Sequence, residues 1–175
     1  MNYFEFFGLP VAFRLDEAQL RRRFYQNSKK YHPDFHTLAS PEEQEEMLRL
    51  STLNNEAFQT LADPDRRMRY VLEIKGLLEG EGQQQVPQEF LLEMMDINEA
   101  LMELEMDYDD RRFEQTAQAV AEWERALDEA IAPILDRYAD DSPDSRGDLL
   151  QVRDYFLKKR YLLRIREKLA TFAAR

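Results

Sequence analysis

The chain of 175 residues has no cysteine, only two histidines and only five glycines. Without a thiol it can form neither a disulfide nor a cysteine-based metal site or nucleophile, and this absence agrees with a reducing compartment. His32 and His36 are the only imidazoles, so a catalytic or metal site built on histidine would have few side chains to use. Few glycines and few alternating β-branched runs leave little signal for β-strands.

Long apolar runs and an excess of cations are absent too. No window approaches the roughly eighteen apolar residues of a membrane span, and the first residues contain no cationic stretch followed by an apolar one. We therefore expect a soluble, cytoplasmic protein that does not bind a membrane. The 24 Lys and Arg are outnumbered by 35 Asp and Glu, a net charge of -11, so nucleic acid, which needs a cationic surface, is not expected as the main partner.

The signals that are present are helical, and they predict an all-α fold. Three potential N-caps each precede an apolar stripe of helical spacing: Asp16, Ser40 followed by Pro41, and Asp63 followed by Pro64. A chain of this length with 43% apolar residues can form one large or two small domains. We expect helices over residues 3–7, 16–32, 41–61, 63–75, 87–106, 110–138 and 145–172.

Residues 76–86 contain three glycines and three successive glutamines, a composition typical of a linker. We therefore place one domain at residues 1–75, a linker at 76–86 and a second domain at 87–175. Because the second domain holds three long predicted helices with short connections, we expect an antiparallel three-helix bundle there. Pro133 is expected to kink or loosen the end of its middle helix.

The tripeptide His32-Pro33-Asp34 directly follows a basic predicted helix. Proline fixes its own φ and keeps the preceding residue out of the helical region, so the motif ends the helix in a rigid turn. The carboxylate of Asp34 could accept a bidentate arginine from a partner, a contact worth about 1.5–3 kcal/mol. Alternatively, the segment is a simple helix end, with cations favoured by the macrodipole. The cations just upstream, which would steer an acidic partner, are Arg21, Arg22, Arg23, Lys29 and Lys30.

The residues around this tripeptide decide between the two interpretations. They are Tyr3-Phe4, Gly8-Leu9-Pro10, Leu20, Phe24, Lys30-Tyr31, Leu53-Asn54-Asn55-Glu56-Ala57-Phe58, Leu61-Ala62-Asp63-Pro64, Arg66-Arg67 and Tyr70. At these spacings residues 1–75 resemble a J-domain. The resemblance implies that the tripeptide engages an ATP-dependent DnaK-class chaperone and stimulates its ATP hydrolysis, with Arg22 and Lys29 as further contacts. Asn27 and Ser28 depart from the usual leucine and alanine, which predicts a weaker core contact at Asn27.

The segment Val86–Asp110 contains nine carboxylates and no Lys or Arg. On a helix its apolar residues form two stripes. The first, which we expect in the core, is Phe90, Met94, Ile97, Leu101 and Leu104. The second, roughly 120° away, is Leu91, Met95, Met102 and Met106. Because a helix in a bundle touches two neighbours, both stripes can be core. Alternatively, the second is an exposed patch, rimmed with acid, that binds a basic partner.

A J-domain followed by a linker and a helical bundle, without a Gly/Phe-rich segment or a cysteine-rich zinc module, is similar to the HscB family of iron–sulphur cluster co-chaperones. The strings that carry this likeness are Tyr3-Phe4, Phe7-Gly8-Leu9-Pro10 and Phe90-Leu91-Leu92-Glu93 onward to Glu105. The resemblance implies that the bundle binds the scaffold protein IscU through its first helix and an aromatic residue of its last. By position these residues are Leu91, Leu92, Met95, Asp96, Glu99, Glu103 and, by a looser alignment, Phe156. A core position suits Phe156 equally well, because it shares a stripe with Leu149, Val152 and Leu163.

The resemblance also implies a co-chaperone that is not itself an enzyme and needs no cofactor. ATP and any iron–sulphur cluster would be bound by its partners, an HscA- or DnaK-class chaperone and IscU. An alternative is a J-domain adaptor for a different client, or a bundle that mediates dimerisation. Carboxylates for acid–base catalysis are plentiful, but no spacing favours a particular pair. His32 and His36 are four residues apart, yet Pro33 interrupts the helix and no third ligand is near, so no metal site is expected.

Overall fold

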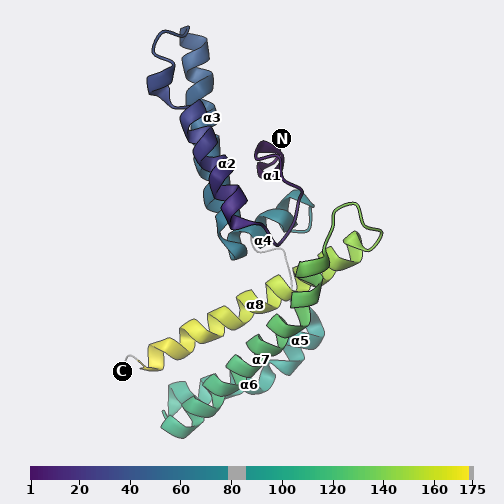
Figure 1. Cartoon of the computed structure of the whole chain (residues 1–175). Coiled ribbons are helices and arrows are strands. Elements are labelled where there is room, and N and C mark those ends of the chain that lie inside the picture. Colours follow the sequence, from purple (N-terminus) through teal and green to yellow (C-terminus); the bar gives the residue numbers. More distant parts are fainter. Residues whose placement is uncertain (79–85, 174–175) are drawn as a thin grey trace. The chain divides into compact units, whose positions relative to one another are not determined.

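In the computed structural model, which describes residues 1–78 and 86–173, the chain is helical and those residues contain no strand (Figure 1). The elements are α1 (Tyr3–Phe6), α2 (Glu17–Lys30), the 3-10 turn η1 (Pro33–Phe35), α3 (Pro41–Ala62), α4 (Pro64–Ile74), α5 (Gln88–Glu93), α6 (Met95–Met106), α7 (Asp110–Arg137) and α8 (Ser145–Ala173). The predicted all-α fold is confirmed. Among the described helices, none combines the length and the apolar character that crossing a bilayer requires.

The chain divides into two compact units. The first comprises residues 1–76 together with the turn at 138–142, and the second comprises the remaining described residues. Most of the predicted linker, residues 79–85, lies outside the described residues.

Local capping chemistry determines where the helices of the first unit begin. The Asp16 carboxylate accepts from the backbone N–H of Gln19 at 3.1 Å, and the Ser40 hydroxyl accepts from the backbone of Glu43 at 3.2 Å. One carboxylate oxygen of Asp63 accepts two N–H groups at the start of α4, at 2.9 and 3.0 Å. All three predicted N-caps are therefore confirmed, because each one satisfies N–H groups that have no partner inside the helix.

The first unit is built on α2 and α3, which run antiparallel as a hairpin (Figure 1). The rings of Phe24 and Phe58 stack across this hairpin with centroids 4.2 Å apart. The guanidinium of Arg67, on α4, is buried and donates to the carbonyl oxygens of Phe13 at 2.8 Å and Leu61 at 2.6 Å. These bonds join α4 to the end of α3 and to the loop before α2, so they fix the position of α4 at one end of the hairpin.

Ser28, one of the two departures from the J-domain pattern, takes part in a polar contact between α2 and α3. Its hydroxyl donates to the carbonyl oxygen of Phe24 at 2.9 Å and accepts from the amide of Asn54 at 3.2 Å. Asn54 is 1% exposed, so this contact lies inside the hairpin. Asn27, the other departure, is half-buried. The hairpin thus contains a hydrogen-bonded pair where an alanine would offer only packing.

The second unit is a three-helix bundle in which α7 packs antiparallel to α8 and contacts α6 (Figure 1). The prediction of one continuous helix over residues 87–106 is wrong in one respect. α5 and α6 are separated at Met94, whose φ and ψ are -82° and -6°. The hydrogen bonds from Met94 N to Phe90 O and from Asn98 N to Met94 O are nevertheless made, so the break is local. α7 continues through Pro133 to Arg137, so this proline does not end the helix.

The core of the bundle confirms the first predicted stripe of α5 and α6. All five of its residues are buried, and they pack with one residue of α7 and four of α8. The residues of this cluster are Phe90, Met94, Ile97, Leu101, Leu104, Val120, Leu162, Ile165, Leu169 and Phe172.

Candidate partner-binding sites

The His32-Pro33-Asp34 segment forms a single 3-10 turn with its carboxylate in solvent. His32 is extended, with φ -65° and ψ 131°, and its Nδ1 accepts from the backbone N–H of Asp34 at 3.2 Å. The Asp34 side chain is 84% exposed. Proline thus ends the helix as predicted, and the turn holds a carboxylate where a partner can reach it.

A second histidine ties this turn to the end of α2. The Nε2 of His36 donates to the carbonyl oxygen of Lys30, the last residue of α2, at 2.8 Å. The backbone N–H of His36 donates to the Pro33 carbonyl oxygen at 3.0 Å. The position of His36 four residues after His32 raised only the question of a metal ligand, because residue spacing does not show which way a side chain points.

The cations of α2 separate into two groups. Arg22 and Lys29 are exposed, and neither forms an ion pair with another described residue, so both are available to a partner. Arg23, by contrast, donates to the carbonyl oxygens of Phe7 and Gly8 and so binds α2 to the loop after α1. Arg23 should therefore be removed from the group of steering cations.

Two large apolar side chains next to the turn were also missed. Phe35 is 72% exposed and Leu38 is fully exposed. The Phe35 ring lies edge-on to the His32 imidazole, with centroids 6.1 Å apart. Their signal was present in the sequence, because both apolar residues follow the tripeptide within a short loop.

The second stripe of α5 and α6 is exposed, so it is not part of the bundle core. Of its four residues, Leu91 is 40% exposed, Met95 61%, Met102 62% and Met106 86%. Leu92, which borders the stripe, is 62% exposed. We call these five residues the Leu/Met face. A contiguous exposed apolar patch with a polar border is typical of a site that binds another molecule, often a protein.

Carboxylates border the Leu/Met face. Asp96, Glu99 and Glu103 are all exposed. Glu103 lies 3.3 Å from the Arg112 Nε, whereas Asp96 and Glu99 form no ion pair with another described residue. The border therefore keeps a net negative charge that favours a basic partner.

Two aromatic residues of α8, Phe156 and Tyr161, lie in different environments. Phe156 is half-buried, with the Arg160 guanidinium 5.4 Å from its ring centroid. Tyr161 contacts α5 and α6: its ring centroid lies 5.6 Å from that of Phe90, and its hydroxyl accepts from the Asn98 amide at 2.7 Å. Five residues of helix turn through roughly 140°, so Phe156 and Tyr161 point to different sides of α8. The binding role of Phe156 stays a prediction.

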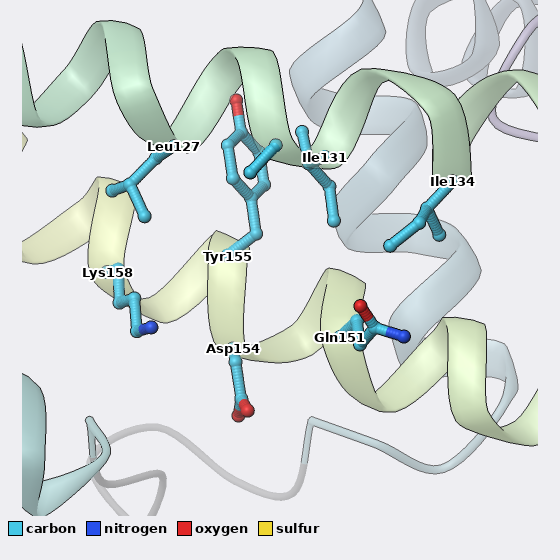
Figure 2. Close-up of a pocket in the computed structure, with 8 residues that line it drawn as sticks. Leu127, Ile131, Ile134, Gln151, Asp154, Tyr155 and Lys158 are labelled. Atoms are coloured by element: carbon cyan, nitrogen blue, oxygen red, sulfur yellow. The ribbon is translucent and has the colours of Figure 1, made fainter.

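A cavity between α7 and α8 is lined mainly by apolar side chains. Ile131 and Ile134 project from α7 toward α8 (Figure 2). The hydroxyl of Tyr155 donates to the Asp128 carboxylate at 2.6 Å, and Asp154 points away from α7 in Figure 2. The side chains of Tyr155 and Asp154 therefore point in different directions (Figure 2).

Two family models match the chain. The model described as a DnaJ domain matches residues 2–70, and the model described as an HSCB C-terminal oligomerisation domain matches residues 86–170. The co-chaperone protein HscB homolog of Vibrio campbellii is 33% identical over 149 residues, which are 78% of this chain and 86% of that protein. The homolog of Vibrio cholerae serotype O1 is 41% identical over 102 residues, 58% of this chain and 60% of that protein, so this alignment spans less than two thirds of the relative.

Solved structures agree along nearly the whole chain. Chaperone HscB from Vibrio cholerae aligns with a TM-score of 0.68 and 27% identity over 97% of this chain and 96% of that one. The human co-chaperone protein HscB aligns with a TM-score of 0.66 and 26% identity over 98% of this chain and 81% of that one. With a J-domain turn, an HscB-type bundle and a curated relative matched over most of its length, the chain belongs to the HscB family of J-domain co-chaperones.

Proposed function

We propose that the protein binds an IscU-type iron–sulphur scaffold protein through its bundle and stimulates ATP hydrolysis by an HscA- or DnaK-class chaperone through its J-domain turn. The observation that carries this proposal is that one chain presents two exposed surfaces with the chemistry of protein-binding sites. They are an exposed carboxylate on a rigid turn and an exposed Leu/Met face with an acidic border.

The chaperone contact is centred on His32, Pro33 and Asp34. A charge-assisted bond from a chaperone arginine to the Asp34 carboxylate is short and directional, and roughly twice as strong as a neutral hydrogen bond. Arg22 and Lys29, both exposed and without a carboxylate partner among the described residues, draw an acidic chaperone surface toward the turn.

The scaffold contact uses Leu91, Leu92 and Met95 as apolar anchors. Unbranched methionines adapt to the shape of a partner, and burying an exposed leucine or methionine side chain contributes about 1.5–3 kcal/mol. The carboxylates of Asp96, Glu99 and Glu103 select a basic border on the scaffold.

Binding both partners at once converts the encounter of chaperone and scaffold into an intramolecular event. ATP stays on the chaperone and the cluster on the scaffold, where the cluster is cargo. The co-chaperone thereby couples capture of the scaffold to ATP hydrolysis, which promotes assembly or transfer of the cluster.

A purified-component assay separates the two contacts. The Asp34→Asn variant is expected to lose most ATPase stimulation while it binds the scaffold normally. Asp65→Asn, an exposed aspartate on α4, is its matched control. Stimulation by Asp34→Asn equal to that of the native chain would refute the role of the turn.

The Leu91→Ser, Met95→Ser double variant is expected to lose scaffold binding and to keep basal stimulation of the chaperone. Leu48→Ser, which changes a 58% exposed leucine on α3, controls for the loss of an exposed apolar side chain. If the double variant kept its helical content and still bound the scaffold as the native chain does, the Leu/Met face would not be the scaffold-binding site. The interpretation of the protein as an adaptor for a different client would then be favoured.

A further inference from the structure

A groove between α6 and α8 adjoins the Leu/Met face. Its floor includes Leu101 and Ile165, which are 3% and 5% exposed. Its α6 side is formed by Met102, a member of the Leu/Met face, and its α8 side by Arg164 and Lys168. A protein that covers the Leu/Met face therefore also reaches the cations of α8.

The cations of α8 differ in what they contact. Lys159 and Arg166 pair with Glu124 of α7, and Lys168 pairs with Glu105 of α6 at 2.9 Å. These pairs neutralise charge within the bundle.

Arg164 is the exception within the groove. It is exposed and forms no ion pair with any residue in the described part of the chain. The α6 residues that line the groove with it are Asn98, Leu101 and Met102, and none of them is charged. A guanidinium beside an apolar wall binds a carboxylate more strongly than one in open water, because the wall excludes solvent from the pair.

Tyr161 supplies a second donor in the same groove. Its hydroxyl accepts the Asn98 amide hydrogen at 2.7 Å, which leaves its own proton free to donate. The groove thus offers a guanidinium and a phenol, both donors, next to an apolar surface.

We propose that the α6–α8 groove is a carboxylate subsite that takes one aspartate or glutamate side chain of the scaffold protein, held by Arg164 and Tyr161. This inference rests on the proposed function, since it requires the scaffold on the Leu/Met face. The face then has a negative border at Asp96 and Glu99 and a positive border at Arg164. A partner must match both signs, and this fixes the orientation in which it docks.

Calorimetric titration of the purified scaffold into variants of the full chain tests the subsite. Arg164→Glu is expected to weaken binding at least about tenfold at low salt, and less at high salt because ions screen the charge. Tyr161→Phe is expected to weaken it about threefold. Arg125→Glu makes the same charge change at an exposed position of α7 and should alter the affinity less than about twofold.

The outcomes distinguish this inference from the proposed function. If the native chain does not bind the scaffold, both are overturned. If the native chain binds, the Leu91→Ser, Met95→Ser variant fails and Arg164→Glu binds like the native chain, the subsite alone is overturned. If Arg164→Glu has a lower melting temperature than the native chain, Arg164→Ala replaces it. This variant removes the donor without adding an acid to the helix. As an independent readout, the Arg164 Nε–H resonance should shift when scaffold is added, and no shift would contradict the contact.

Discussion

The Nε2 of His36 donates a hydrogen bond to the carbonyl oxygen of Lys30 at 2.8 Å. This carbonyl belongs to the last turn of α2, where carbonyl groups have no donor inside the helix. The bond closes the loop that contains His32, Pro33 and Asp34 onto the helix that carries Arg22 and Lys29. The turn and the cations are therefore held in one arrangement before a partner arrives.

Replacing His36 is expected to loosen that arrangement. In His36→Ala the turn must be ordered when the chaperone binds, and the lost bond is worth about 0.5–1.5 kcal/mol. The concentration needed for half-maximal ATPase stimulation should rise about two- to tenfold, while the maximal stimulation and the melting temperature change little. His36→Gln, which keeps a donor, should recover part of the loss. An unchanged half-maximal concentration in His36→Ala would show that the bond does not position the turn.

The buried amide of Asn54 is only partly satisfied. Its nitrogen donates to Phe24 O and to the Ser28 hydroxyl, both at 3.2 Å, whereas its buried oxygen accepts no hydrogen bond from a described residue. Asn54→Leu replaces this amide by an apolar side chain of similar size and is expected to raise the free energy of unfolding by about 1–2 kcal/mol. Asn55→Leu, at an exposed neighbour, measures the gain from helix propensity alone. Urea unfolding compares the two, and a destabilised Asn54→Leu would contradict the prediction.

Tyr70 should make the first unit sensitive to alkali. Its hydroxyl accepts the backbone N–H of Tyr3 at 2.9 Å, and burial raises its pKa above the ordinary value of 10.0. Since the fold favours the neutral phenol, the stability that Tyr70 contributes is complete below about pH 10 and is lost as the pH rises through the raised pKa. Urea unfolding measures the free energy of unfolding at pH values from about 8 to 11. This free energy should fall less steeply with pH in Tyr70→Phe than in the native chain. Equal slopes would mean that Tyr70 does not titrate with unfolding.

Local chemistry explains why the helix starts could be predicted. Asp16, Ser40 and Asp63 satisfy N–H groups two or three residues away, so the signal and the structure lie in the same short segment. The rigid turn follows in the same way from Pro33, whose ring restricts two successive residues. The expectation that this turn binds a chaperone did not follow from local chemistry, because it depended on the resemblance of residues 1–75 to a J-domain.

Packing over longer distances explains what could not be predicted. A helical stripe shows which side chains share a face, but not whether another helix covers it. Met94 and Met102 belong to two stripes of similar apolar character, yet only the first is covered by α7 and α8. The contact of Tyr161 with Asn98 could not be predicted either, because it depends on which side of α8 meets α6.

Met94 and Met95 test the exposure of the Leu/Met face most directly, because they are neighbours with opposite environments. Met94 is fully buried in the bundle core and Met95 is 61% exposed. Met94→Ala leaves a cavity and is expected to lower the free energy of unfolding by about 2–5 kcal/mol. Met95→Ala should change it by less than about 0.5 kcal/mol but weaken scaffold binding about tenfold. Each variant is the control for the other, since the substitution is the same. If Met95→Ala destabilised the fold as much as Met94→Ala does, the second stripe would be core, and the case for a binding face would fail.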